Sequence, residues 1–204
     1  MPIGFFLMTE KGLHVLQAVV STFGPDQIEY VVGAADKNLA KDYRDEIAVV
    51  CRQNGIAYFD RHDSDDSQNQ FRATAEYHFA VSWRWLIHDA KRLIVLHDSL
   101  PKYRGFTPLP TALINGEPFV GVTALFAGRE YDRGDILGQR KLPISYPVKI
   151  QSVISSLSGI RNPRRGPLPA HSRRRHPDRH STKRRGSHLF PVARRRRLSH
   201  TLVR

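Results

Sequence analysis

The sequence of 204 residues has room for one domain, or for one domain followed by a tail. It contains a single cysteine, Cys51, so no disulfide can form within the chain, which fits a reducing compartment. No apolar run approaches the roughly 20 residues of a membrane span, and the N-terminus lacks the basic flank and cleavage site of a signal peptide. We therefore expect a cytoplasmic location.

The net charge of +13 is concentrated in the last part of the chain. Residues 161–204 hold fourteen Arg and one Lys against a single acid, Asp178, which leaves +14 there and, by subtraction from +13, −1 for residues 1–160. The folded part is therefore expected to be nearly neutral, and the basic character belongs to the tail alone.

Hydrophobic patterns of strand and helix alternate along the first hundred residues. Apolar runs of strand length occur at five places: 3–8, 28–33, 56–59, 78–82 and 93–96. Amphipathic spacing predicts a helix after Thr9, which is expected to cap it, and another over residues 36–54. Cys51 lies on the apolar face of that second helix, so we interpret it as a packed thiol rather than a nucleophile. The polar, acid-rich stretch 60–70 is interpreted as a solvated loop, because it lacks the turn Gly and terminal Glu of a calcium loop.

The second half of the domain ends differently. Residues 112–116 predict a short helix that ends on Gly116, and residues 118–127 and 136–143 predict two strands with no helix between them. The expected fold class is therefore α/β: a Rossmann-like, mostly parallel twisted sheet flanked by helices, with an antiparallel strand pair at its end and a disordered basic tail. We place the domain at residues 1–159 and the tail at residues 160–204.

The most informative stretch is 97–105, His-Asp-Ser-Leu-Pro-Lys-Tyr-Arg-Gly, directly after the strand 93–96. A titratable His at the carboxyl end of a buried strand lies where open α/β sheets place their chemistry. About 35 residues on, Asp132 lies in a turn between the last two strands, so its loop can return towards His97. An imidazole suits a general base and a neighbouring carboxylate can hold its tautomer. The alternatives are a structural histidine and a turn-forming aspartate.

These motifs together resemble the formyltransferases that use N10-formyltetrahydrofolate, and most of all the sugar N-formyltransferases and methionyl-tRNA formyltransferase-like proteins. The resemblance covers roughly residues 2–159. The motifs that carry it are His97, Ser99-Leu100-Pro101, Tyr103-Arg104-Gly105, Gly121-Val122-Thr123 and Asp132-Arg133-Gly134.

Two positions depart from the family pattern. Val95 stands where the family has Asn, and Leu100 stands where it has two Leu residues. In the family the Asn helps the His to stabilise the oxyanion, and losing one such donor typically lowers the rate by about 10²–10³. Either backbone amides or a water molecule replace it, or catalysis is weak.

The resemblance implies transfer of a formyl group from N10-formyltetrahydrofolate, the co-substrate, to a primary amine. His97 would be the general base and Asp132 would orient it. The loop after the fourth strand would contact the pterin largely through backbone groups, although its aromatics also fit a role in core packing. The residues implied for folate are Trp83, Arg84, Leu86, Ile87, Arg133 and Gly134. Those implied for the amine substrate are Ser99, Tyr103 and Arg104, with Arg104 receiving a phosphate or else forming a plain ion pair.

Elimination favours an amino group of a nucleotide-linked amino sugar as the acceptor. Formylation of initiator tRNA in this family uses a second, C-terminal domain that the sequence does not encode. The glycinamide-ribonucleotide enzymes carry a Gly-rich loop where this chain has 9–12, Thr-Glu-Lys-Gly. A formyltetrahydrofolate hydrolase is a further alternative. No metal and no membrane partner is expected, and a homodimer is compatible with the sequence.

The tail from residue 161 onward has no hydrophobic period, and three interpretations compete for it. It is a nucleic-acid-binding arm, a localisation or membrane-surface patch, or a segment translated in the wrong reading frame. We favour the last, because reading each codon from its second base allows residues 160–167 to spell Tyr-Glu-Thr-Leu-Val-Glu-Ala-Leu, an amphipathic helix similar to the closing part of the family. A catalytically inactive, frameshifted product that binds nucleic acid non-specifically is therefore the alternative to an enzyme. Pro177 separates His176 from His180, which argues against a metal site there.

Overall fold

A computed structural model describes residues 1–62, 74–87, 90–99, 102–128 and 130–159. The expectations for most of the acid-rich loop, for Leu100 and for the tail at 160–204, including His176 and His180, lie outside the described residues.

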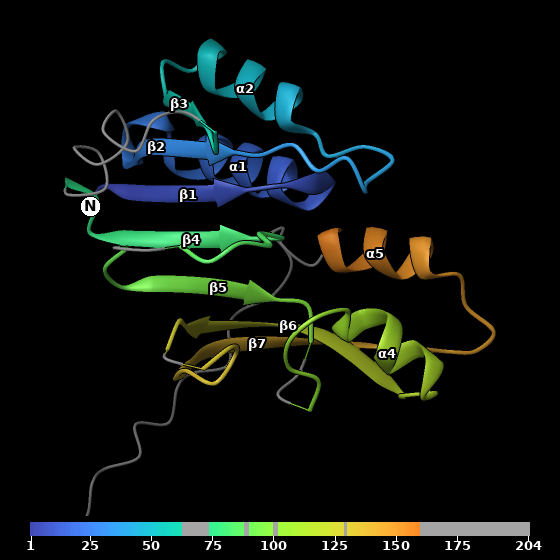
Figure 1. Cartoon of the computed structure of the whole chain (residues 1–204). Coiled ribbons are helices and arrows are strands. Elements are labelled where there is room, and N and C mark those ends of the chain that lie inside the picture. Colours follow the sequence, from blue (N-terminus) through green and yellow to red (C-terminus); the bar gives the residue numbers. More distant parts are fainter. Residues whose placement is uncertain (63–73, 88–89, 100–101, 129, 160–204) are drawn as a thin grey trace, which may run out of the picture. The chain divides into compact units, whose positions relative to one another are not determined.

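In the described part of the chain, seven strands form one sheet in the order β3-β2-β1-β4-β5-β6-β7 (Figure 1). They are β1 (Ile3–Leu7), β2 (Ile28–Gly33), β3 (Ala57–Asp60), β4 (Tyr77–Val81), β5 (Leu93–His97), β6 (Phe119–Phe126) and β7 (Ile136–Pro143). The first five pair in parallel, whereas β6 runs antiparallel to β5 and β7 antiparallel to β6. The predicted α/β class, with its antiparallel end, is confirmed.

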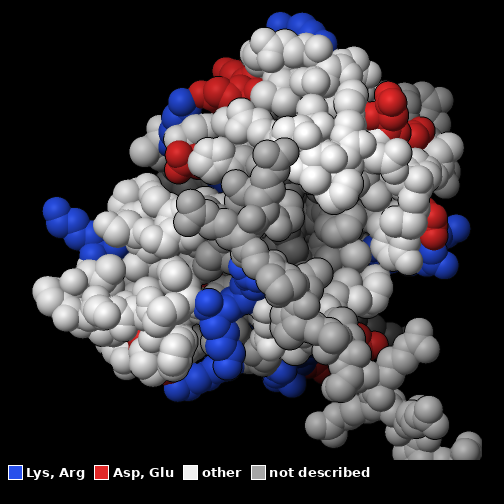
Figure 2. Space-filling model, turned by 180° about the vertical axis from the view of Figure 1, so that it is seen from behind, with Lys and Arg blue, Asp and Glu red and all other residues white. Residues whose placement is uncertain are grey.

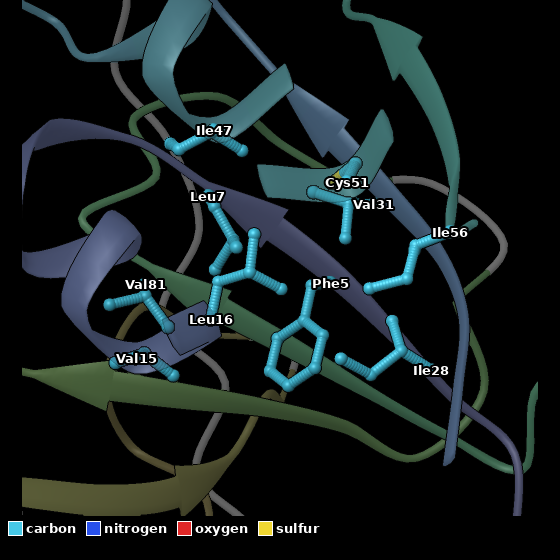
Figure 3. Packing of buried hydrophobic residues seen from close by; sticks show 10 residues of the cluster. All are labelled: Phe5, Leu7, Val15, Leu16, Ile28, Val31, Ile47, Cys51, Ile56 and Val81. Atoms are coloured by element: carbon cyan, nitrogen blue, oxygen red, sulfur yellow. The ribbon is translucent and has the colours of Figure 1, made fainter. Parts of the chain in front are cut away.

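The helices described are α1 (Thr9–Phe23), α2 (Arg44–Gln53), α4 (Pro108–Ile114) and α5 (Ile150–Gly159). Val15 and Leu16 of α1, with Ile47 and Cys51 of α2, pack against apolar side chains of the parallel strands (Figure 3). The strand residues of this cluster include Phe5, Leu7, Val31 and Val81. Cys51 is fully buried, as predicted, and that burial raises the pKa of its thiol to about 12.

Two predictions at helix starts are wrong. The helix expected from residue 36 begins only at Arg44, because Asp36 and Asp42 organise a loop instead. The carboxylate of Asp36 accepts the backbone N–H of Asn38, and that of Asp42 accepts the backbone N–H of Arg44 at 3.0 Å. Such short local bonds compete with the helix ladder. Thr9 lies inside α1 with φ 64°, and no side chain among the described residues caps the helix.

The register of β5 decides which side of the sheet carries His97. Side chains alternate across a strand, so Val95 and His97 share a face. Val95 packs against a second apolar cluster that includes Phe6, Tyr30 and Ala80. On the neighbouring antiparallel strand Thr123 is the partner of His97. His97 therefore ends β5 at the carboxyl edge, on the face of this second cluster.

Figure 2 shows side chains of both charge signs on one face of the molecule. On the face shown in Figure 2, acidic side chains lie mostly in the upper half, and one group of basic side chains lies at the centre of the lower half. This mixture agrees with the near-neutral balance of residues 1–160. Among the helices of the described residues, none combines the length and the apolar character needed to cross a membrane.

Candidate active site

His97 is held at the end of β5 with only 8% of its surface exposed. The chain that follows it is fixed to β6, because the Thr123 hydroxyl donates to the Ser99 carbonyl oxygen at 2.6 Å. The Gln139 side-chain amide on β7 donates in turn to the Thr123 hydroxyl at 3.0 Å. The predicted Gly-Val-Thr motif thus contributes a buried threonine that ties three segments together behind the imidazole.

Asp132 reaches His97 from the loop between β6 and β7. Its Oδ2 lies 3.4 Å from His97 Nδ1 and accepts the backbone N–H of Gly105 at 2.8 Å. Asp132 has φ 53°, in the left-handed region that Asp and Asn adopt more readily than most residues. One carboxylate oxygen therefore faces the imidazole and also joins the two loops that carry the recognised motifs.

The other ring nitrogen of His97 is engaged as well. Nε2 lies 2.6 Å from the carbonyl oxygen of Tyr103, and because a carbonyl only accepts, Nε2 is the donor. Both nitrogens of the ring thus face oxygen acceptors. Sequence reasoning missed this contact, because a backbone carbonyl has no residue signature.

A small hollow that is partly open to solvent lies beside this pair. The residues that line it are His97, Arg104, Thr123, Leu125, Asp132, Gly134 and Ile136. Gly134 is required by space, since a Cβ there would lie 1.7 Å from the carbonyl oxygen of Phe126. The structure therefore brings together four of the predicted site residues: His97, Arg104, Asp132 and Gly134.

The predicted folate residues after β4 lie elsewhere. None of them is among the described residues that line the hollow. The Trp83 ring packs edge-on against Phe6 at 5.3 Å between centroids, and Ile87 contacts the same apolar cluster. Arg84 Nη1 pairs with Asp36 Oδ2 at 2.7 Å, while Leu86 is 64% exposed.

The remaining predicted residues divide between two places. Arg133 is exposed and pairs with Glu130 at 2.8 Å. Ser99 and Tyr103 line a second small hollow, together with Asp98 and Glu117. The Tyr103 hydroxyl donates to Glu117 Oε1 at 2.6 Å. Ser99 and Tyr103 therefore line a different hollow from the one that Arg104 lines, although the Tyr103 carbonyl contacts His97.

An ion pair that sequence reasoning missed supports the segment after His97. Lys11, in the first turn of α1, contacts the carboxylate of Asp98 and is only 7% exposed. A cation at a helix N-terminus opposes the helix dipole, so a buried one needs an acidic partner. A lysine in the first turn of a predicted helix was therefore a signal in the sequence that an acidic partner is needed. The sequence does not indicate which acidic residue that partner is.

The geometry suits proton handling next to a reacting group. An imidazole with a carboxylate on one nitrogen can accept a proton on the other nitrogen and pass it on. Arg104 adds a fixed positive charge at the same hollow. Such a set fits acyl transfer, in which a proton leaves the nucleophile while negative charge develops on an oxygen.

Comparison with known proteins gives a family match and several similar proteins. The family described as formyl transferase matches residues 33–157. A methionyl-tRNA formyltransferase of Lysinibacillus sphaericus is 41% identical over 68 residues, which cover 33% of this chain and 22% of that protein. The chain thus matches about a fifth of the length of this curated relative.

Solved structures share the fold at low sequence identity. A sugar 3N-formyl transferase, solved in the presence of dTDP and 5-N-formyl-THF, superposes with a TM-score of 0.61 at 21% identity, covering 78% of this chain and 58% of that one. A phosphoribosylglycinamide formyltransferase from Bacillus halodurans superposes with a TM-score of 0.62 at 13% identity, covering 78% of this chain and 89% of that one.

Proposed function

The chain belongs to the formyl transferase family, and from that premise we propose that it transfers a formyl group from N10-formyltetrahydrofolate to a primary amine. The observation that carries the proposal is the 3.4 Å approach of His97 Nδ1 to Asp132 Oδ2 beside a hollow at the carboxyl edge of the sheet. His97 is the general base and Asp132 orients it.

The reaction moves one formyl group and one proton. The acceptor nitrogen forms a bond to the formyl carbon, and the π electrons of the carbonyl move to its oxygen. When the carbonyl re-forms, the bond from that carbon to N10 breaks. The proton lost by the acceptor nitrogen passes to His97 Nε2 and then to N10, so His97 ends as it began.

This assignment gives each nitrogen of His97 its own task. Once the acceptor displaces the Tyr103 carbonyl, the ring proton lies on Nδ1, towards the Asp132 carboxylate, and Nε2 becomes the basic site. The Tyr103 carbonyl now occupies Nε2 at 2.6 Å. The incoming amine therefore replaces that carbonyl as the partner of Nε2, and the segment around Tyr103 has to shift when the acceptor binds.

For the acceptor we propose an amino group of a nucleotide-linked amino sugar. A sugar 3N-formyl transferase solved with dTDP is among the structures that share the fold, which supports this choice. The sequence argument supports it too, since a glycine-rich phosphate loop is missing after β1. The folate residues after β4, together with Arg133 and Gly134, remain part of the proposal, with the β4 segment acting mainly through its backbone.

The test is an acceptor screen of the 204-residue chain. The chain is incubated with N10-formyltetrahydrofolate and, separately, a dTDP-linked amino sugar, glycinamide ribonucleotide, methionyl-tRNA or buffer alone. Tetrahydrofolate release and N-formyl product are measured. We expect product with the amino sugar, and a rate about 10²–10⁴ lower in His97→Gln.

A surface histidine supplies the control for that screen. His14→Gln, on the exposed side of α1, should match the wild type. Formation of formate in buffer alone, without any N-formyl product, would replace the transferase proposal by a hydrolase. Undiminished product in His97→Gln would remove the assigned base.

We also propose that residues 160–204 are translated out of frame. The family match ends at residue 157, just before the composition changes, which supports this reading. Sequencing the gene tests the frameshift directly. Codons for residues 160–167 that cannot encode Tyr-Glu-Thr-Leu-Val-Glu-Ala-Leu when read from their second base would exclude it. Retention of the chain on DNA that salt weakens, and that vanishes when residues 161–204 are deleted, would favour a nucleic-acid-binding arm instead.

A further inference from the structure

The proposed reaction needs a hydrogen-bond donor for the formyl oxygen, and the inference drawn here rests on that proposed function. Negative charge builds on this oxygen when the amine attacks, and acyl-transfer sites usually meet it with a donor fixed in advance. The question is which side chain at the hollow beside His97 can supply one.

Among the described residues that line the hollow, three carry side-chain donors: His97, Thr123 and Arg104. The Thr123 hydroxyl already donates to the Ser99 carbonyl oxygen at 2.6 Å. His97 donates through Nε2 to Tyr103, and in the proposed reaction it carries the proton rather than the oxyanion. Two of the three donors are therefore committed elsewhere.

Val95 cannot fill the gap. It shares the face of His97 on β5 but packs against an apolar cluster that includes Phe6 and Ala80, and it has no polar atom in its side chain. The position two residues before the imidazole is therefore part of the core, and the donor has to come from a loop.

Arg104 is the side chain that satisfies these conditions. It lines the hollow from the loop after β5, and within the described part of the chain it forms neither an ion pair nor a hydrogen bond. Asp132, the carboxylate of the same hollow, is engaged with Gly105 and His97 instead. A guanidinium remains charged at every relevant pH and offers five N–H donors in a planar fork.

We propose that the Arg104 guanidinium donates to the formyl oxygen as it becomes negatively charged, which makes Arg104 a catalytic residue of the hollow. The competing role is to anchor a phosphate of the acceptor. The two roles differ in kinetics, because an oxyanion contact exists only in the transition state whereas a phosphate contact exists in the bound substrate as well.

The first test compares Arg104→Met and Arg104→Lys with Arg140→Met. Arg140 is an exposed arginine on β7 that does not line the hollow, so its variant should keep wild-type rates. We expect Arg104→Met to lower kcat by about 10²–10³ with little change in KM, for amines with or without a phosphate. Arg104→Lys should retain part of the rate, and added guanidinium should partly restore Arg104→Met. A rise in KM confined to phosphate-bearing acceptors, with kcat unchanged, would overturn the proposal.

The second test does not depend on turnover. Formate, a small carboxylate, is titrated into the wild type and both Arg104 variants while the His97 ring protons are followed by NMR. We expect saturable shifts in the wild type, and at least about a tenfold weaker response in Arg104→Met. Formate that leaves the His97 signals unmoved in the wild type would overturn the anion site. Saturable binding in a chain that forms no N-formyl product would instead refute the proposed function and leave the anion site standing.

Discussion

The hollow beside His97 and the segment 82–87, here called the β4 loop, were both expected to bind a ligand, the loop largely through its backbone. They turn out to be built differently. At the hollow, His97 and Arg104 from the stretch 97–105 meet Asp132 from the loop between β6 and β7. In the β4 loop, Trp83 packs into an aromatic cluster and Arg84 pairs with Asp36. Side chains used for packing have little left to offer a ligand, so a loop of this kind can contribute mainly its backbone.

Among the variants that separate the hollow from the β4 loop, Gly134→Ala is expected to have the largest effect. In Gly134→Ala the new methyl group would lie 1.7 Å from the Phe126 carbonyl oxygen, so the end of β6 or the Asp132 loop must move. A misplacement of about 1 Å can cost about 10²-fold in rate, and overpacking typically costs about 1–3 kcal/mol in stability. Formyl-transfer assays and urea unfolding measure the two.

Gly138→Ala on β7 is the matched control, because a Cβ there meets nothing within 4 Å. It should unfold close to the wild type and keep its activity. If the two alanine variants had equal stability and activity, the Asp132 loop would adapt freely to the added methyl group. The hollow beside His97 would then not be rigidly built.

Trp83→Ala tests whether the β4 loop is held by packing. The ring is half-buried and lies 5.3 Å from both Phe6 and Trp85, so we expect a loss of about 2–3 kcal/mol in the free energy of unfolding. Trp83→Phe should recover most of it. The opposite pattern, unchanged stability with much weaker folate binding in both variants, would make Trp83 a ligand-binding side chain.

Arg84→Met tests whether the charged side chain of Arg84 binds the folate. Its ion pair with Asp36 is partly exposed, and pairs of this kind contribute little to stability. We therefore expect almost no change in Tm, and a dissociation constant for the folate that changes by less than about threefold, as measured by calorimetry. A much larger weakening with a normal Tm would show that the guanidinium itself binds the folate.

Cys51 provides a reference from the packed core. Burial raises the pKa of its thiol from 9.0 to about 12, so the native chain should not react with a thiol reagent at pH 8, whereas the urea-unfolded chain should react once. Because the folded state holds the proton more tightly, this contribution to stability is complete below pH 9 and is lost as the pH rises towards 12. Rapid labelling of the native chain would contradict a tightly packed α2.

The sequence was most informative where a regular period met a motif. The apolar run 93–96 placed His97 at a strand end, and the turn between two strands placed Asp132 within its reach. The sequence-based prediction of the start of α2 was wrong, because the carboxylates of Asp36 and Asp42 accept local backbone N–H groups there. Periodicity reports which face of an element is apolar, but not where local hydrogen bonds end that element.

The missed parts of the site are tertiary. The Tyr103 carbonyl at His97 Nε2 involves a backbone atom, and Lys11 meets Asp98 across nearly ninety residues. Neither contact has a local pattern. Packing also explains the departure at Val95, since the sequence could identify it as a missing donor but not as a member of an apolar cluster.

The central claim is that His97 and Asp132 act as one unit in formyl transfer, and a double-mutant cycle tests it most directly. Asn tolerates the left-handed φ of 53° at position 132, so Asp132→Asn removes the charge and leaves the backbone in place. Formyl transfer to the amino-sugar nucleotide is measured for the wild type, His97→Gln, Asp132→Asn and the double variant. The account predicts that the double variant is no slower than His97→Gln alone, because the carboxylate acts only through the imidazole. Rate losses that multiply would show that the two residues act independently, and would contradict it.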